Sequence, residues 1–131
     1  MSSKIDPTLK YQKTHEWARL DGNVIVVGIS DHAQDALSDL VFVDLPRVGT
    51  ALKAGERFGT VESVKAASDV YMPVAGVITA INVALERTPE TINTDPYVNG
   101  WLIKITPTNA ADLGSLLDAA AYGQYLAEEH V

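Results

Sequence analysis

The stretch that decides the fold is Glu62-Ser63-Val64-Lys65-Ala66-Ala67-Ser68-Asp69. Three apolar residues before Lys65 suit a half-buried strand: Phe58, Val61 and Val64. Those that follow it alternate with other residues, at Val70, Met72 and Val74. Alternation is typical of a strand with one buried face. The pattern predicts a β-hairpin with Lys65 at its tip.

Lys65 is expected to be accessible at such a tip, because its small neighbours at positions 66–68 leave its amine almost unscreened. A modifying enzyme could therefore reach it, and Glu62 and Asp69 supply acidic groups nearby. Taken alone, however, the pattern favours an ordinary solvated lysine on a turn, since most lysines are exposed in any protein.

Length and composition bound the function. A chain of 131 residues with 47% hydrophobic and 21% charged residues fits one globular domain, with a core at about residues 16–106 and a helical extension at about 108–129. The net charge of −7 makes nucleic acid an improbable partner and suits docking on basic protein surfaces. Because the chain has no cysteine, disulfides and thiolate metal sites are excluded.

The N-terminal residues show neither the apolar core of a signal peptide nor an Arg-rich amphipathic pattern. No stretch reaches the length that a membrane span needs. We therefore expect a cytoplasmic protein, either of bacterial type or already processed, with no targeting peptide in the chain as given and no membrane partner.

The rest of the chain predicts many short strands. Residues 17–20 and 24–29 should form a hairpin around Asp21-Gly22, a turn pair that accepts positive φ. A short helix should follow, with Asp31 and Gln34 as a capping box. Further strands are expected at residues 40–43, 77–83 and 101–105, and helical spacing of apolar residues predicts C-terminal helices after Pro107. These elements indicate a mainly β fold with α+β additions, a small sandwich or flattened barrel.

No catalytic constellation is visible. His15, His32 and His130 do not show the spacing that places two histidines on one helical face. Folding could still bring His15 and His32 together with Glu16 as a weak metal site, although structural histidines are favoured. Ser63 and Ser68 lack a nucleophile elbow, and their roles are expected in the turn and the strand.

Several motifs together resemble the glycine cleavage system H protein family. Residues 62–69 resemble its lipoylation motif. Further matches occur in the family's order and spacing: Lys10-Tyr11, Thr14-His15-Glu16-Trp17, Gly28-Ile29-Ser30-Asp31-His32-Ala33-Gln34, Asn93-Thr94-Asp95-Pro96-Tyr97 and Gly100-Trp101. The similarity runs from about Tyr11 to the C-terminal helices.

The resemblance implies a non-catalytic carrier with a lipoyl-type barrel-sandwich hybrid fold and lipoate joined covalently to Lys65. It also implies that the attaching enzyme, a lipoate ligase or lipoyl transferase, recognises the residues around that lysine, namely Glu62, Ser63, Val64, Ala66 and Asp69. The residues it implies as a cradle for the loaded arm are Glu16, His32 and Asp69. Structural roles would explain these carboxylates equally well: Glu16 could be a solvated residue at the edge of the sheet, and Asp69 could cap a turn.

The implied partners are a pyridoxal-phosphate glycine decarboxylase, a tetrahydrofolate-dependent aminomethyltransferase and a flavin dihydrolipoyl dehydrogenase. Three alternatives remain open. A biotin carrier is disfavoured because Val64 and Ala66 flank the lysine where that family typically has methionines. A lipoate relay to other lipoyl enzymes would use the same lysine, and an unmodified interaction module would need no modification at all.

Overall fold

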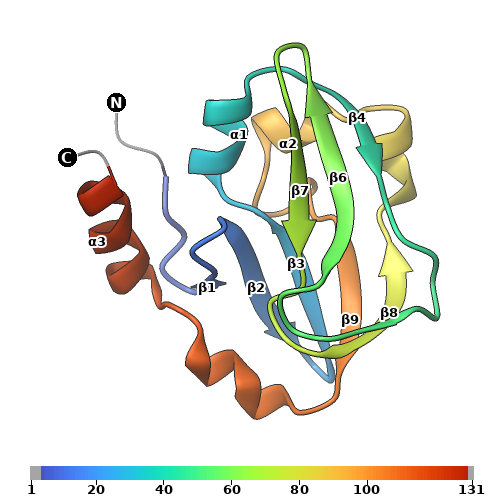
Figure 1. Ribbon diagram of the computed structural model, residues 1–131, viewed down its shortest axis with the longest axis vertical. Coiled ribbons are helices and arrows are strands. Elements are labelled where there is room, and N and C mark those ends of the chain that lie inside the picture. Colours follow the sequence, from blue (N-terminus) through green and yellow to red (C-terminus); the bar gives the residue numbers. More distant parts are fainter. Residues whose placement is uncertain (1–3, 130–131) are drawn as a thin grey trace.

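The protein, described here by a computed structural model, consists of two antiparallel β-sheets with helices around them (Figure 1). The structure describes residues 4–129. The strands are β1 (Lys10–Tyr11), β2 (Glu16–Asp21), β3 (Val24–Ile29), β4 (Leu40–Asp44), β5 (Ala51–Leu52), β6 (Arg57–Ser63), β7 (Ala67–Tyr71), β8 (Gly76–Ile81) and β9 (Ile103–Pro107). One sheet has the order β1-β2-β3-β9-β8-β5 and the other β4-β6-β7.

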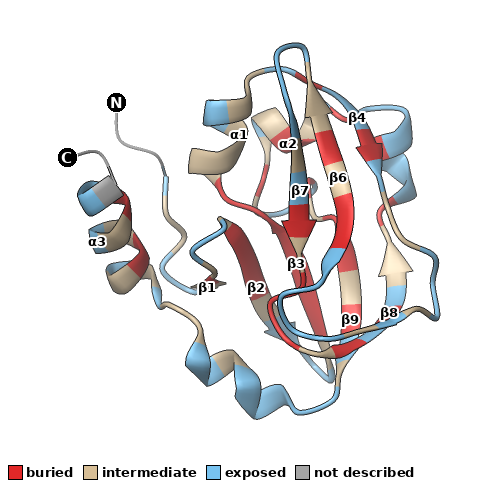
Figure 2. Cartoon of the chain, in the orientation of Figure 1, coloured by how far each residue is buried: buried red, intermediate tan, exposed pale blue. Residues whose placement is uncertain are grey.

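The hydrophobic core lies between the two sheets, as the alternation in the sequence predicts. Ile25, Ile105 and Ile78 face it from the larger sheet, while Val61 and Val70 face it from the smaller one. Figure 2 shows β2 and β3 largely buried and the tip of the β6–β7 hairpin exposed. Burial of one face of each sheet therefore fixes the register in which the hairpin projects from the core.

Both expected hairpins are present. Asp21 pairs with Val24 across the β2–β3 turn, where Gly22 has a φ of 65°, a conformation that costs glycine little. Glu62 pairs with Ala67 at the end of the β6–β7 hairpin. Val64 does not belong to the strand, in contrast to the sequence-based prediction. It lies in the turn and is 68% exposed, since β6 ends at Ser63.

The helix after the first hairpin is α1 (Asp31–Leu37), and its N-cap differs from the prediction. Ser30, not Asp31, caps the helix by accepting a hydrogen bond from the Ala33 backbone N–H at 3.2 Å. The predicted pair of Asp31 and Gln34 does interact, with Gln34 Nε2 donating to Asp31 Oδ1 at 2.9 Å. The N-cap therefore lies one residue earlier than the sequence pattern predicts.

Two later strands also differ in their bounds. The strand expected to reach residue 83 ends at Ile81, and Val83 begins the 3-10 helix η1 (Val83–Glu86). A single helical turn, α2 (Thr91–Thr94), follows it. The strand expected at residues 101–105 is shifted to β9, which includes Pro107 opposite Gly76. Trp101 precedes that strand and is half-buried.

The C-terminal extension comprises the 3-10 helix η2 (Ala110–Ser115) and the α-helix α3 (Ala119–Glu129). Helix α3 packs on a second apolar cluster, on the outer face of the larger sheet, through Tyr122 and Leu126. The Tyr122 ring stacks on the Tyr11 ring with centroids 4.3 Å apart. Among residues 4–129, no helix is long and apolar enough to span a membrane.

Candidate functional site

The hairpin tip that carries Lys65 is a two-residue turn held by Ser63. The Ser63 backbone N–H donates to the Ala66 carbonyl at 2.7 Å. The Ser63 hydroxyl accepts from the backbone N–H of Lys65 at 3.3 Å and of Ala66 at 3.0 Å, and it donates to the Ala66 carbonyl at 3.1 Å. One small side chain thus binds the backbone of Lys65 and Ala66 together.

The tip is also tethered to the smaller sheet on one side. The Val64 backbone N–H donates to the Asp39 carbonyl at 3.1 Å, and β4 pairs with β6 up to Ser63. Lys65 itself is exposed. Within residues 4–129, no hydrogen bond or ion pair holds its ammonium group. The backbone below the lysine is therefore fixed while its side chain projects into solvent.

The other candidate recognition residues lie on the same hairpin. Asp69 Oδ1 accepts a hydrogen bond from the Thr60 hydroxyl at 3.2 Å, and that hydroxyl accepts one from Arg57 Nη1 at 3.0 Å. Asp69 is exposed, and Glu62 is half-buried opposite Ala67. The Asp69 carboxylate is thus part of a strand ladder and not a turn cap. Sequence reasoning missed Thr60 and Arg57, because cross-strand pairing brings them to Asp69.

Glu16 is buried, with 1% of its surface exposed, so its interpretation as a solvated edge residue is wrong. Its Oε1 accepts from Gln12 Nε2 at 3.0 Å and from the Thr14 hydroxyl. Its Oε2 accepts from the Tyr71 backbone N–H at 3.0 Å. Burial raises the pKa of the Glu16 carboxyl to about 7, against the opposing effect of these hydrogen bonds. The carboxyl group can therefore change charge near neutral pH.

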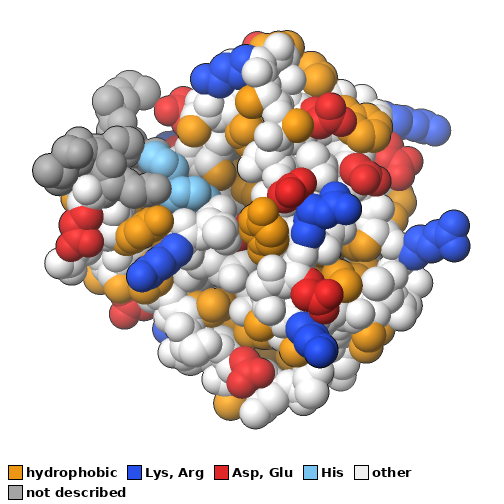
Figure 3. Space-filling view, in the orientation of Figure 1, with side chains coloured by type: hydrophobic (Ala, Val, Ile, Leu, Met, Phe, Trp, Pro, Cys, Tyr) orange, Lys and Arg blue, Asp and Glu red, His pale blue; other side chains and the backbone are white. Residues whose placement is uncertain are grey.

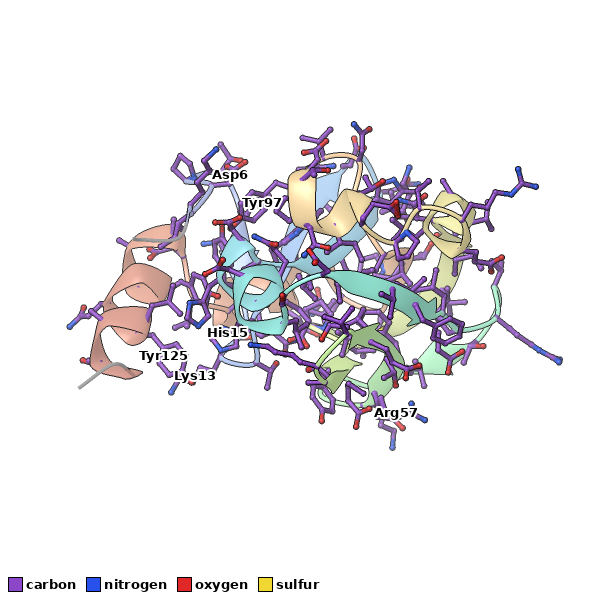
Figure 4. The ribbon with its side chains drawn as sticks, turned by 90° about the horizontal axis from the view of Figure 1, so that it is seen from above. Asp6, Lys13, His15, Arg57, Tyr97 and Tyr125 are labelled. Carbon is purple, nitrogen blue, oxygen red and sulfur yellow. The ribbon has the colours of Figure 1, made fainter. Side chains whose placement is uncertain are left out.

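The two histidines that the sequence could only suggest as neighbours do meet. The rings of His15 and His32 have centroids 4.8 Å apart. His15 has a φ of 80°, which is uncommon for a residue with a side chain. Its Nδ1 lies 2.8 Å from the Tyr122 hydroxyl, which lies 2.7 Å from the Ser30 hydroxyl. Figure 4 shows His15 close to Tyr125, on the side that α3 covers.

These histidines form no metal centre with Glu16 in the part of the chain that the structure describes, where no group of three or more potential ligands is found. His130 lies outside the described residues. The His15 ring belongs to the packing of α3 against the β1–β2 loop, which agrees with a structural role.

The three candidate cradle residues come from separate elements. Glu16 on β2 reaches the backbone of β7 at Tyr71, two residues from Asp69. His32 lies on α1, against the ring of His15, the residue before Glu16. Within residues 4–129, the Glu16 carboxylate binds Gln12, Thr14 and the Tyr71 backbone, while the Asp69 carboxylate binds Thr60. The structure therefore brings β2 and β7 together without a hydrogen bond between the Glu16 and Asp69 carboxylates in the described part of the chain.

Comparison with known proteins agrees with this geometry. A model of the glycine cleavage H-protein family matches residues 9–129. The chain belongs to the glycine cleavage H-protein family. This family comprises the lipoyl carriers of the glycine cleavage system.

Similar proteins include the glycine cleavage system H protein of Bacteroides fragilis, which is 57% identical over 114 residues, 87% of this chain and 90% of that protein. The H protein of Thermus thermophilus is 53% identical over 119 residues, 91% of this chain and 93% of that protein. The crystal structure of an H protein from Mycobacterium marinum has a TM-score of 0.84 and 40% identity, covering 97% of this chain and all of that one. The expected lipoyl-type barrel-sandwich hybrid fold is thereby confirmed.

Proposed function

We propose that this chain is the lipoyl carrier of a glycine cleavage system and that Lys65 bears the lipoyl group. The observation that supports this most directly is an exposed lysine at a turn whose backbone is fixed by the Ser63 hydroxyl. A rigid turn presents the same amine in the same place to the attaching enzyme and to each later partner. Preorganisation of this kind reduces the entropy that each docking event costs.

The residues around Lys65 fit a covalently attached acyl group. Their small side chains, at Ala66, Ala67 and Ser68, leave the amine accessible, and the Lys65 ammonium is not committed to a partner within residues 4–129. When bound, a lipoyl group supplies a disulfide that accepts a one-carbon fragment together with two electrons. The contribution of the chain is to tether that group, which keeps its effective concentration at a docked partner on the order of mM.

Glu16, His32 and Asp69 are proposed as the cradle of the loaded arm. The aminomethyl group carried in glycine cleavage is a cation, which carboxylates favour by charge pairing. Glu16 suits the task because a cation beside its carboxyl would favour the ionised form, which burial alone disfavours near pH 7. Asp69 lies on β7, two residues from the Tyr71 N–H that Glu16 binds, and His32 lies on α1.

The specific partners follow from the same proposal. Glycine decarboxylase with pyridoxal phosphate would load the arm, aminomethyltransferase with tetrahydrofolate would unload it, and dihydrolipoyl dehydrogenase with FAD would reoxidise it. A lipoate ligase or lipoyl transferase would attach lipoate, using residues 62–66 and Asp69 for recognition. In this scheme the chain is a carrier and supplies no catalytic group of its own.

The test is peptide mass mapping of Lys65 from the native host, combined with reconstituted glycine decarboxylation. Replacing Lys65→Ala should abolish both the modification and turnover. The matched control is Lys53→Ala, which removes an exposed lysine from a different turn and should leave both unchanged. Turnover that persists in the Lys65→Ala protein would refute the assignment.

A further inference from the structure

Strand β7 is an edge strand whose backbone groups point alternately toward β6 and away from it. It lies at the end of the order β4-β6-β7. Hydrogen bonds to the β6 side are made at Ala66, from the Ser63 N–H at 2.7 Å, and at Met72, to the Glu56 carbonyl at 2.8 Å. In a regular antiparallel pair this alternation makes Ser68 and Val70 face β6 as well. Ala67, Asp69 and Tyr71 then face away from it.

Tyr71, the outward-facing residue farthest from the hairpin tip, has its backbone groups bound by side chains. The Tyr71 N–H donates to Glu16 Oε2 at 3.0 Å, and the Tyr71 carbonyl accepts from Gln12 Nε2 at 2.9 Å. Both backbone groups of Tyr71 are thus paired as a neighbouring strand would pair them. The side chains of Gln12, in the β1–β2 loop, and Glu16, the first residue of β2, thus take the place of a neighbouring strand at this one residue.

The backbone groups of Ala67 and Asp69, the two outward-facing residues nearer the tip, are open. Within residues 4–129, the backbone groups of Ala67 make no hydrogen bond on this side, and Asp69 has only a long contact of 3.4 Å from the Ser68 hydroxyl to its carbonyl. The opposite flank of the hairpin is closed up to its tip, because β4 covers β6 and Asp39 binds the Val64 N–H. The open edge therefore begins two residues from Lys65 and lies on one flank only.

Natural proteins usually protect such an edge with charged side chains, especially lysine, or with proline or a bulge. Residues 67–70 contain neither proline nor lysine, and their pairing with β6 is regular, since the register shift lies between Arg57 and Gly59. The side chains of Ala67 and Ser68 are small and place no bulk beside the edge. Asp69 is the one charged side chain among residues 67–70, so this edge next to the acceptor lysine is a template for strand addition by a segment of opposite charge.

We propose that the Ala67–Asp69 edge of β7 is a docking edge for an extended segment of the enzyme that acylates Lys65. This inference rests on the function proposed above. The added strand would hold Lys65 at a fixed register relative to the bound acyl donor. Its main-chain groups would pair with those of Ala67 and Asp69, and pairing would stop at Tyr71, where Glu16 and Gln12 already fill the edge.

Charge and burial define what the segment should look like. The Asp69 side chain lies on the exposed face of the small sheet and Val70 on the buried face. A strand beside them should therefore carry a lysine or arginine next to Asp69, where opposite charges across a strand pair are favourable. An apolar residue should lie next to Val70. The partner is thus an alternating basic and apolar strand near the active site of the acylating enzyme.

Amide hydrogen exchange on the isotope-labelled chain tests this directly. The chain carries Lys65→Met, so that it binds the host's lipoate ligase without turnover, and the ligase is supplied with lipoate and ATP. The amides of Ala67 and Asp69 should exchange rapidly in the chain alone and at least about tenfold more slowly with the ligase. The amides of Ser68 and Val70, paired with β6 already, should be slow in both states.

Unchanged exchange at residues 67 and 69, while the ligase shifts the resonances of Val64 and Ala66, would overturn the docking edge and leave Lys65 lipoylation intact. Protection in the chain without ligase that increases with its concentration would also overturn it, by assigning the edge to a second copy. Protection in the lipoylated chain alone would assign the edge to the arm instead. Independently, Ala67→Pro, which removes an outward N–H, should raise the ligase KM, whereas Ala67→Val should not.

Discussion

At the scale of single residues, Ser63 is the side chain that fixes the position of Lys65. Its hydroxyl contacts the backbone of both Lys65 and Ala66. We predict that Ser63→Ala leaves the turn without these hydrogen bonds, lowering the free energy of unfolding by about 1 kcal/mol. The kcat/KM for lipoylation should fall severalfold, because the lysine is no longer held in one orientation.

The matched control is Ser68→Ala, since the Ser68 hydroxyl makes only the 3.4 Å contact to the Asp69 carbonyl. Lipoylation rates measured with purified ligase should be unaffected by this change. Equal rates for Ser63→Ala and the wild type would show that the turn needs no support from the Ser63 hydroxyl.

Glu16 provides a second prediction at this scale, on pH. Burial raises the pKa of its carboxyl from an ordinary 4.5 to about 7. Because the folded state holds the proton more tightly, the stabilisation is complete below pH 4.5 and is lost as pH rises through about 7. The difference in pKa corresponds to on the order of 3 kcal/mol.

The variant Glu16→Gln removes this titration. Unfolding by urea, followed from pH 5 to pH 8, should show the wild type losing on the order of 2 to 3 kcal/mol relative to the variant. The amide group places N–H donors beside those of Gln12 or Tyr71, which adds a penalty that does not depend on pH. A constant difference across this range would mean that Glu16 titrates normally in the folded protein.

At the scale of elements, the packing of β2 on β3 depends on a close approach at Gly28. A Cβ at Gly28 would lie 2.7 Å from atoms of the Trp17 ring, and that ring is fully buried and anchored by its Nε1 donating to the Pro96 carbonyl at 2.9 Å. We predict that Gly28→Ala lowers the free energy of unfolding by about 1 to 3 kcal/mol through overpacking.

The control is Gly114→Ala, where an added Cβ meets nothing within 4 Å. Thermal and urea unfolding of this variant should match the wild type within about 0.5 kcal/mol. A Gly28→Ala protein as stable as the control would indicate that Trp17 has room to move away from β3.

The elements that the sequence predicts best are those defined by neighbours along the chain. Alternation around Lys65 and the Asp21-Gly22 pair are local signals, and both hairpins follow from them. The cap at Ser30 was missed because serine and aspartate are both good N-caps, and only the backbone conformation decides between them.

The candidate site divides in the same way. The position of Lys65 at an exposed turn could be predicted, because the turn is formed by consecutive residues. The burial of Glu16 could not, because it depends on Tyr71, which lies 55 residues further along the chain. The meeting of His15 and His32 likewise depends on how α1 packs beside the β1–β2 loop.

At the scale of the whole molecule, the hairpin tip and the C-terminal helix lie apart. Figure 1 shows the tip of β6–β7 at one end of the molecule, the β2–β3 turn at the other and α3 to one side. Figure 3 shows acidic and basic side chains interspersed on the face that carries β6 and β7. On this face the net charge of −7 does not form a single acidic patch, so the position of each carboxylate decides which encounter it assists.

This arrangement predicts how salt and charge affect docking. Raising NaCl from about 0.05 M to about 0.5 M should increase the KM of lipoate ligase for the chain and leave kcat unchanged, because screening weakens encounter more than chemistry. Asp69→Asn and Asp21→Asn both remove one exposed carboxylate, but Asp21 lies at the β2–β3 turn, away from Lys65. Only Asp69→Asn should raise KM at low salt and reduce its dependence on salt. Equal effects of the two variants would mean that the total charge of the molecule, and not the hairpin face, governs docking.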